Sequence, residues 1–160
     1  MLGGKLMISV LFICHGNICR SPMAEFLFKD YLKKKNKLDL FYIDSKATST
    51  EEIGNRVHSG TRKVLDKYNI DYSNKRASQI TKADYEKFDF IIAMDEYNIY
   101  NLLRILGNDN KKKIHLLLSY AGINRDISDP WYTGNFIQTE KDILLGIDAF
   151  YKYLVANKFI

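Results

Sequence analysis

Residues 8–22 read Ile-Ser-Val-Leu-Phe-Ile-Cys-His-Gly-Asn-Ile-Cys-Arg-Ser-Pro. The apolar run stops at Cys14, and an amphipathic pattern begins after Pro22. This order predicts a buried strand over 7–13, a tight loop, and a helix from Pro22 to about residue 35. Proline suits the first helical position because its missing N–H has no partner there. Such a loop directs backbone N–H groups at a helix N-terminus, which is a favourable place for an anion.

Two side chains give this loop its chemistry. Cys14 lies at its lip, and Arg20 follows six residues later. Backbone N–H groups, the helix dipole and a guanidinium all favour a thiolate, so we expect a nucleophile at the bottom of a phosphate-binding cradle. Arg20 can clamp phosphoryl oxygens with two parallel donors. A buried structural cysteine is a common alternative, but it does not explain the arginine or the Ser21-Pro22 pair that follows.

The rest of the chain alternates between strand-like and helix-like segments. Strands are predicted over 38–45, 88–94 and 114–118, and helices over 55–68, 95–106 and 139–156. Residues 78–88 are expected to form a turn and a short helix with Thr81 as N-cap. This alternation predicts an α/β fold, a parallel four-stranded sheet with helices on both faces. Ligands bind such sheets outside the carboxyl ends of the strands. We therefore expect Cys14, the loop 47–54, Asp95 and the loop 119–136 at one edge.

The loop 119–136 contains a candidate acid. A cysteine attacking a phosphate ester needs a partner that protonates the leaving group. Asp129 fits this role, because Pro130 stiffens the backbone beside it and Trp131 and Tyr132 can form aromatic walls. An isolated Asp-Pro pair usually forms a turn, but its place after the fourth strand favours the catalytic interpretation.

Length and charge limit the class of protein. The 160 residues suit one domain, and residues 1–6 are read as a possible extension or tag remnant ahead of Met7. The net charge is +5, and lysines cluster at 33–35 and 111–113. Without interleaved aromatic residues, these clusters indicate solvated ends rather than a nucleic-acid surface. The chain has no apolar run of the ~20 residues that a membrane span requires, and no signal-peptide pattern, so neither nucleic acid nor membrane is an expected partner.

The two cysteines lie in one loop, so they do not form the spread framework of a disulfide-rich protein. Cys14 and Cys19 are expected to serve reactivity in a reducing compartment, most simply the cytoplasm. The histidines at 15, 58 and 115 have no ligand spacing, so no metal is expected.

These motifs resemble a known family. Residues 14–22 resemble the signature of the low-molecular-weight protein tyrosine phosphatases, and residues 129–132 look like their general-acid motif. Shorter matches occur in order at 45, 47–49, 53–54, 79–81 and 94–96, so the resemblance spans nearly the whole chain. It implies a flavodoxin-like, three-layer α/β/α fold. It also implies hydrolysis of phosphotyrosine through a cysteinyl-phosphate intermediate, without a cofactor.

The resemblance also implies residue roles. Cys14 would be the nucleophile, Arg20 the clamp on the transition-state phosphate, and Asp129 the acid and then the base. The phosphate-binding loop would comprise His15, Gly16, Asn17, Ile18, Cys19 and Ser21; the substrate rim Glu51, Trp131 and Tyr132; and the loop supports Ser45, Ser49 and Asp95. Cys19 would form a reversible disulfide with Cys14 that prevents over-oxidation. The expected partners are phosphotyrosine proteins or peptides, with inorganic phosphate or similar oxyanions as product or inhibitor.

Alternatives on the same scaffold remain. Protein-arginine phosphatases have a similar loop but carry Thr at the position of Ile18. The bulkier Ile18 leaves less room for a phosphorylated guanidinium. A thioredoxin-coupled arsenate reductase needs a further cysteine pair. A non-catalytic phosphate-binding module would be expected to lose Cys14, Arg20 or Asp129. One departure concerns Glu51, where relatives commonly carry Trp or Tyr: a carboxylate there repels phosphate and favours basic flanking residues. His15 is expected on the rim.

Overall fold

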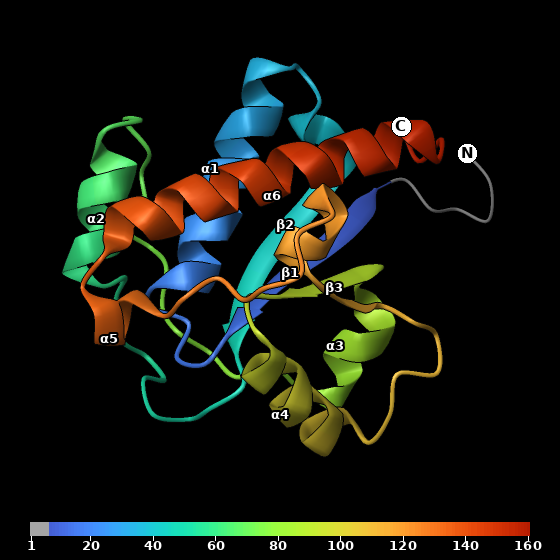
Figure 1. Ribbon diagram of the computed structural model, residues 1–160, viewed down its shortest axis with the longest axis horizontal. Helices are drawn as coiled ribbons and strands as arrows, with labels where there is room; N and C mark the ends of the chain where they lie inside the picture. Colours follow the sequence, from blue (N-terminus) through green and yellow to red (C-terminus); the bar gives the residue numbers. More distant parts are fainter. Residues whose placement is uncertain (1–6) are drawn as a thin grey trace.

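The computed structural model describes residues 7–160. Its centre is a sheet of four parallel strands in the order β2-β1-β3-β4 (Figure 1). The strands are β1 (Ile8–Cys14), β2 (Phe41–Ala47), β3 (Phe90–Ala93) and β4 (Ile114–Leu116). Their carboxyl ends are aligned, since Cys14 pairs with Ala47, Ile13 with Ala93, and Ala93 with Leu116. The predicted α/β fold is confirmed, and the loops after the strands begin at one sheet edge.

Helices cover both faces of the sheet. In Figure 1, α1 (Arg20–Lys34), α2 (Ser59–Asp66) and α6 (Phe136–Ala156) lie on one side, and α3 (Lys82–Lys87) and α4 (Glu96–Leu106) lie on the other. Short elements complete the chain: the 3-10 helices η2 (Leu38–Leu40) and η3 (Leu117–Ala121), and the helix α5 (Pro130–Thr133). The result is the expected three-layer α/β/α arrangement.

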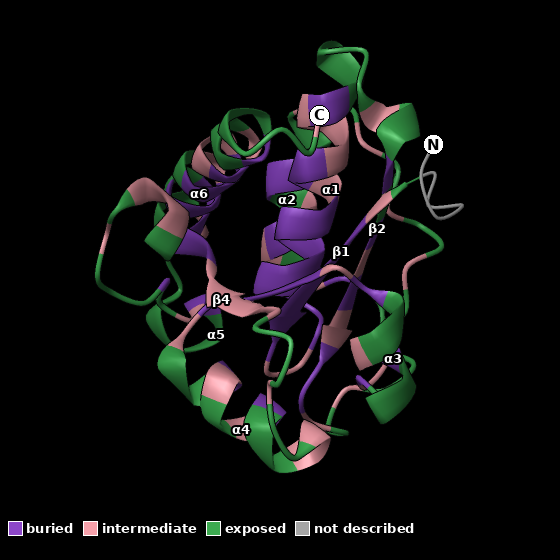
Figure 2. Ribbon diagram, turned by 90° about the vertical axis from the view of Figure 1, so that its right-hand side faces the viewer, coloured by how far each residue is buried: buried purple, intermediate pink, exposed green. Residues whose placement is uncertain are grey.

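The central strand β1 contributes side chains to two apolar cores, one on each face of the sheet. Alternate side chains of a strand point to opposite faces, so Val10 and Phe12 pack in the large core under α1 and α6, whereas Leu11 and Ile13 pack in a smaller core under α3 and α4. Figure 2 shows β1 and the inner face of α1 as buried. Cys14 points to the same face as Val10 and Phe12 and is 2% exposed. The buried strand therefore fixes its position at the sheet edge.

The predicted starts of two helices were wrong. Helix α1 begins at Arg20, so Pro22 is its third residue rather than its first. Proline is tolerated there because the first four N–H groups of a helix have no intrahelical partner. Helix α2 begins only at Ser59, because the residues before it pair with the segment around Ala77. The carbonyl of Asn55 accepts from the N–H of Ala77, and the N–H of Gly54 donates to the carbonyl of Ala77. The N-cap of α2 is His58, whose Nδ1 accepts from the N–H of Gly60 at 3.0 Å.

The predicted long loop before the last helix is shorter than expected. It contains η3 and α5, and α6 begins at Phe136 rather than at 139. The signal for this earlier start is Asn135, whose side chain accepts from the N–H of Gln138 at 3.0 Å. Thr81 is confirmed as the N-cap of α3, in a capping box with Asp84.

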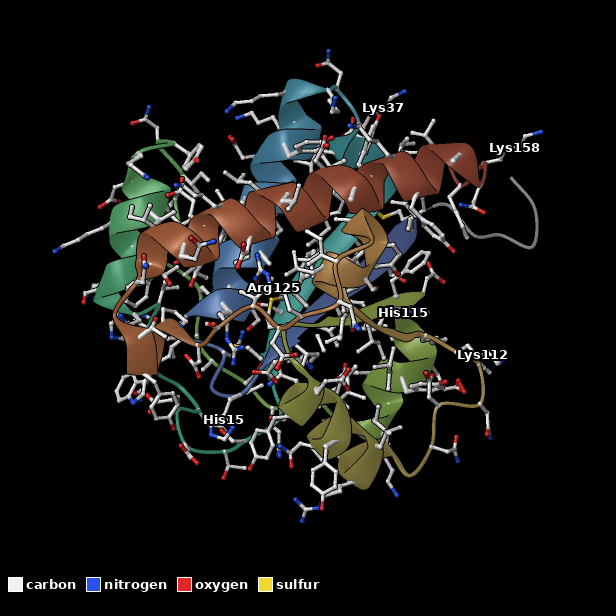
Figure 3. The ribbon with its side chains drawn as sticks, viewed as in Figure 1. His15, Lys37, Lys112, His115, Arg125 and Lys158 are labelled. Carbon is white, nitrogen blue, oxygen red and sulfur yellow. The ribbon has the colours of Figure 1, made fainter. Side chains whose placement is uncertain are left out.

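The lysine clusters lie away from the sheet edge that carries the site. Lysines 33–35 lie at the C-terminal end of α1, whereas the Cys14 loop precedes its N-terminal end. Figure 3 shows Lys112, of the second cluster, at the periphery and away from His15. Within residues 7–160, none of the helices has the length and apolar character needed to cross a membrane. The possible extension over residues 1–6 lies outside the described residues.

Candidate active site

The loop between β1 and α1 is held open by its neighbours. Three of its carbonyl groups accept hydrogen bonds from backbone N–H groups: Cys14 from Thr48, His15 from Ser49, and Ile18 from His58. In a trans peptide the carbonyl and the next N–H point in opposite directions. The N–H groups that follow these carbonyls are therefore turned away from the supporting segments, as an anion cradle requires.

Asn17 is the internal brace of the loop. It is 1% exposed and adopts a positive φ of 59°, a conformation that asparagine tolerates better than most residues. Its side-chain amide donates to Ser21 Oγ at 2.8 Å and to Ser45 Oγ at 3.0 Å, and its oxygen accepts from the N–H of Ser78 at 3.2 Å. The predicted support residue Ser45 thus lies directly beneath the loop.

Cys14 Sγ has two polar neighbours. Ser21 Oγ lies 3.0 Å from it, and the N–H of Asn17 donates to it at 3.3 Å. A hydroxyl can turn its hydrogen toward a negatively charged sulfur. Both groups are therefore placed to donate hydrogen bonds to the sulfur.

Arg20 is buried beside the cysteine, with 2% of its surface exposed. Its Nη1 donates to Asp95 Oδ2 at 2.6 Å and to the carbonyl of Ile127 at 2.8 Å, while Nη2 lies 3.4 Å from Asp129 Oδ2. Burial lowers the pKa of Arg20, but the charges of Cys14 and Asp95 outweigh it and raise the pKa above its usual value. The guanidinium is therefore fixed in position and in charge.

Asp129 is oriented by the turn that it begins. It is the N-cap of α5, and its Oδ1 accepts from the N–H of Trp131 at 3.0 Å. The other oxygen faces Arg20. Pro130 occupies the first position of this helix, where proline is favoured. The Asp-Pro motif thus forms a turn and also aims a carboxylate oxygen into the site.

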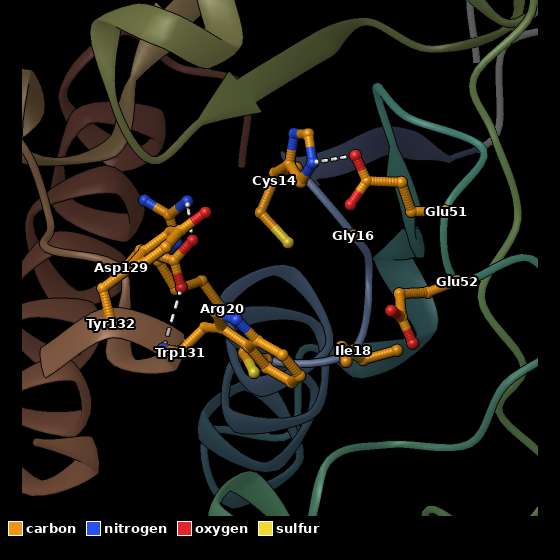
Figure 4. A pocket seen from close by; sticks show the side chains of 11 residues that line it. Cys14, Gly16, Ile18, Arg20, Glu51, Glu52, Asp129, Trp131 and Tyr132 are labelled. Carbon is orange, nitrogen blue, oxygen red and sulfur yellow. Dashed lines mark hydrogen bonds and ion pairs between the residues drawn. The ribbon is translucent and has the colours of Figure 1, made fainter. Parts of the chain in front are cut away.

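One pocket gathers the three predicted catalytic residues, the predicted rim residues and part of the predicted phosphate-binding loop. It is lined by Cys14, His15, Gly16, Ile18, Cys19, Arg20, Glu51, Glu52, Asp129, Trp131 and Tyr132. Figure 4 shows Glu51 and Glu52 on one side and Asp129 and Tyr132 on the other. Trp131 and Tyr132 are 57% and 83% exposed, as expected for a rim. Glu52 was not anticipated from the sequence, although its place next to Glu51 in the same loop was a signal.

His15 lies on the rim, as predicted. Its Nε2 is 3.1 Å from Glu51 Oε2, and its ring stacks against Tyr97 of α4 with centroids 6.3 Å apart. Ser49 supports Glu51 on this part of the rim, because its hydroxyl accepts from the N–H of Glu51 at 3.4 Å. Tyr97 was not singled out from the sequence, where it resembles any exposed aromatic residue of a helix.

Cys19 lines the pocket as a free thiol. It is 5% exposed and packs with Ile18, Ala77 and Phe136. Burial raises its pKa far above the usual value, and the charge of Cys14 adds to this effect. Cys19 is therefore a neutral thiol near neutral pH. No group of three or more His, Cys, Asp or Glu side chains in residues 7–160 is arranged to hold a metal ion.

Comparison with known proteins identifies the family. Residues 9–158 match the model of the low molecular weight phosphotyrosine protein phosphatases. The chain belongs to this family. YfkJ of Bacillus subtilis, a low molecular weight protein-tyrosine-phosphatase, is 44% identical over 132 residues, which cover 81% of this chain and 85% of YfkJ. PtpA of Staphylococcus aureus, of the same description, is 35% identical, with 94% and 96% of the two chains covered.

Solved structures agree with this assignment. The crystal structure of YfkJ superimposes with a TM-score of 0.92 at 39% identity, covering 98% of this chain and 99% of YfkJ. The structure of DARP, a Drosophila arginine phosphatase, gives a TM-score of 0.82 at 31% identity, covering 90% and 96% of the two chains. The expected family and flavodoxin-like fold are thus confirmed. The chain is a protein-tyrosine-phosphatase of the cysteine-based kind and acts on phosphoproteins.

Proposed function

We propose that this phosphatase hydrolyses phosphotyrosine in proteins or peptides, with Cys14 as nucleophile, Arg20 as phosphate clamp and Asp129 as general acid and base. The observation that carries the proposal is the convergence of these three side chains. Arg20 Nη2 lies 3.4 Å from Asp129 Oδ2, and both residues line one pocket with Cys14. The remainder of residues 14–21 would form the phosphate-binding loop around them.

The first step is attack by the Cys14 thiolate on phosphorus. A sulfur–phosphorus bond forms while the bond from phosphorus to the tyrosine oxygen breaks. Asp129 gives its proton to the departing oxygen, so the product leaves as a neutral phenol. Arg20 and the loop N–H groups hold the charge on the other phosphoryl oxygens, which is where preorganised donors lower a barrier most.

The second step releases phosphate. Asp129, now a carboxylate, takes a proton from a water molecule that attacks phosphorus, and the sulfur–phosphorus bond breaks. The thiolate returns to its contacts with Ser21 and Asn17. Inorganic phosphate is therefore the product, and we expect it and similar oxyanions to compete with substrate. The scheme uses side chains of the chain and water alone.

Ile18 supports tyrosine over arginine as the phosphorylated residue. It lines the pocket and is 8% exposed, so it offers an apolar wall and no hydrogen-bond partner for a guanidinium. An aromatic ring suits this wall and the neighbouring Trp131. Phosphoarginine is the second candidate, because the fold resembles an arginine phosphatase and Glu52 lies in the pocket wall.

The test is phosphate release under reducing conditions. We expect the wild type to hydrolyse a simple aryl phosphate and a phosphotyrosine peptide, and Cys14→Ser to release nothing above background. A wild type as inert as Cys14→Ser on every substrate would refute the catalytic roles. The same peptide with phosphoarginine serves as the comparison, and faster release from it would favour the second candidate.

The chemistry also indicates a compartment. A free thiol nucleophile persists where glutathione and thioredoxin keep cysteines reduced. We therefore propose that the enzyme works in the cytoplasm on phosphotyrosine proteins, as one domain. Cys19 would act as the redox partner of Cys14.

A further inference from the structure

The side of the pocket formed by loop 47–54 carries charge that the proposed mechanism does not use. Glu51 and Glu52 line this side, while the opposite side carries Asp129 and two aromatic residues. A phosphotyrosine brings two negative charges to this place. A carboxylate on the rim repels the phosphate of such a substrate. A positively charged residue elsewhere in the substrate would offset this repulsion by pairing with the carboxylate.

Glu51 is held at the pocket mouth by the catalytic loop. Its Oε2 lies 3.1 Å from His15 Nε2, and its backbone N–H donates to Ser49 Oγ at 3.4 Å. The N–H of Ser49 in turn donates to the carbonyl of His15 at 3.0 Å. The loop that bears Glu51 and the loop that bears Cys14 are thus joined by both backbone and side-chain bonds.

His15 is itself fixed in place. Its side chain is 33% exposed, and its ring stacks on Tyr97, which stacks on Tyr100 along α4. A fixed histidine gives Glu51 a defined position beside the nucleophile. Because only one oxygen of Glu51 faces His15 and a carboxylate can accept several hydrogen bonds, a second donor can still bind it.

Glu51 remains accessible to a peptide. Its side chain is 67% exposed, whereas Glu52 is half-buried and accepts from Asn55 Nδ2 at 2.9 Å. The stem of Glu52 packs over Gly16, where an added Cβ would lie 3.3 Å from its Cγ. Of the two rim carboxylates, Glu51 is therefore the one placed to meet residues beside the phosphotyrosine.

We propose that Glu51 is a specificity-determining residue, which favours substrates carrying lysine or arginine next to the phosphotyrosine and disfavours acidic neighbours, and that His15 is the positioning residue that holds it at the rim. The inference rests on the proposed phosphotyrosine activity. A lysine or arginine of the substrate would pair with Glu51, and an acidic residue would meet its repulsion.

The experiment compares three phosphotyrosine peptides that differ only in the residues on either side of the phosphotyrosine: lysine, glutamine or glutamate. We measure kcat/KM at low ionic strength. An exposed ion pair changes an affinity up to about fivefold, so attraction and repulsion together predict a ratio of roughly tenfold between the lysine and glutamate peptides. Raising the salt to about 1 M should remove most of this ratio, since the Debye length falls to ~3 Å.

Variants then test whether Glu51 and His15 cause the difference between the lysine and glutamate peptides. Glu51→Gln should lower kcat/KM for the lysine peptide and raise it for the glutamate peptide, so that the ratio falls about threefold or more. A general structural defect would lower both. His15→Ala should reduce the ratio in the same direction, and His15→Gln, which keeps a donor, should restore part of it. The control is Glu86→Gln, an exposed glutamate paired with Lys111 on another part of the molecule, which should leave the ratio unchanged.

Two kinds of result would overturn the inference. One is equal kcat/KM for the three peptides in the wild type, or a preference for the glutamate peptide. The other is a ratio that Glu51→Gln leaves intact. Failure of the proposed function is distinct, because then none of the peptides and no simple aryl phosphate is hydrolysed.

Discussion

The guanidinium of Arg20 and the carboxylate of Asp95 lie 2.6 Å apart at the edge of the sheet. Asp95 uses its two oxygens differently: Oδ2 faces Arg20, while Oδ1 accepts from the N–H of Asn98 at 2.7 Å and caps α4. One residue therefore ties α4, on the other face of the sheet, to the proposed phosphate clamp. Tightly placed groups matter in such a site, because a small misplacement of a reacting group reduces the rate strongly.

Replacing Asp95 separates these two functions. Asparagine is as good an N-cap as aspartate, so Asp95→Asn should keep α4 while it removes the charge that holds Arg20. We expect kcat/KM for a phosphotyrosine peptide to fall about tenfold to a hundredfold. Asp95→Ala should show the same loss and also lower the free energy of unfolding by about 1 kcal/mol through loss of the cap. Steady-state kinetics and denaturant unfolding check both; full activity in Asp95→Asn would show that Ile127 and Asp129 suffice to place Arg20.

Substitutions of Asn17 can likewise separate the role of its backbone conformation from that of its side-chain amide. Its φ of 59° suits glycine, but its amide also braces Ser21 and Ser45. Asn17→Gly should retain the conformation and lose the bracing, so kcat should fall with little change in fold. Asn17→Ala should lose activity as well and be less stable than Asn17→Gly by about 1–2 kcal/mol, the cost of a Cβ in the left-handed region. Equal stability of the two variants would mean that the loop has relaxed to a different φ.

The sequence predicted which side chains converge in one pocket better than it predicted the limits of the helices and strands. Cys14, Arg20 and Asp129 could be placed because strand ends of a parallel sheet meet at one edge. The supporting network could not be predicted. Glu25 lies inside the first helix and looks like a solvent-facing glutamate, yet it is 3% exposed and accepts from Ser45 Oγ at 2.6 Å. Its partner Lys75 lies 2.9 Å away but fifty residues later, and no local pattern indicates that contact.

Asp129→Asn tests the proton donor. Loss of general acid catalysis should reduce kcat by ~10²–10⁴ for a phosphotyrosine peptide. The loss should be smaller for an aryl phosphate whose phenol is strongly acidic, because that leaving group departs without a proton. The comparison of the two substrates is therefore sharper than either rate alone. Equal losses on both substrates would assign Asp129 to holding Arg20 instead of donating a proton.

Oxidation tests the proposed role of Cys19. Hydrogen peroxide converts the Cys14 thiolate to a sulfenic acid, and condensation with the Cys19 thiol forms a disulfide and releases water. Wild type treated with peroxide should regain activity on addition of dithiothreitol, and Cys19→Ser should recover less because Cys14 proceeds to the sulfinic acid. Because burial raises the pKa of Cys19 far above its usual value, its thiolate stays scarce up to about pH 9, so the rate of disulfide formation should keep rising with pH and not level off near the usual pKa of a thiol. Mass spectrometry of Cys14 distinguishes the products, and equal recovery of both proteins would remove the protective role.

Gly146 tests how closely α6 packs on the rest of the fold. Replacing a helical glycine by alanine usually stabilises a helix by about 1 kcal/mol. Here an added Cβ would lie 2.4 Å from Cγ of Leu117, which is fully buried in η3. Overpacking of this kind costs about 1–3 kcal/mol, so Gly146→Ala should lower the free energy of unfolding in spite of its helix propensity.

A double-mutant cycle identifies the cause of that loss. Leu117→Ala alone should destabilise by about 2–5 kcal/mol through a cavity, but it also makes room for the methyl group at 146. The double variant should then be more stable than the sum of the two single changes predicts, by more than about 0.5 kcal/mol. Urea unfolding of the four proteins measures this coupling. Strict additivity, or a Gly146→Ala protein more stable than the wild type, would mean that α6 can shift away from η3 at no cost.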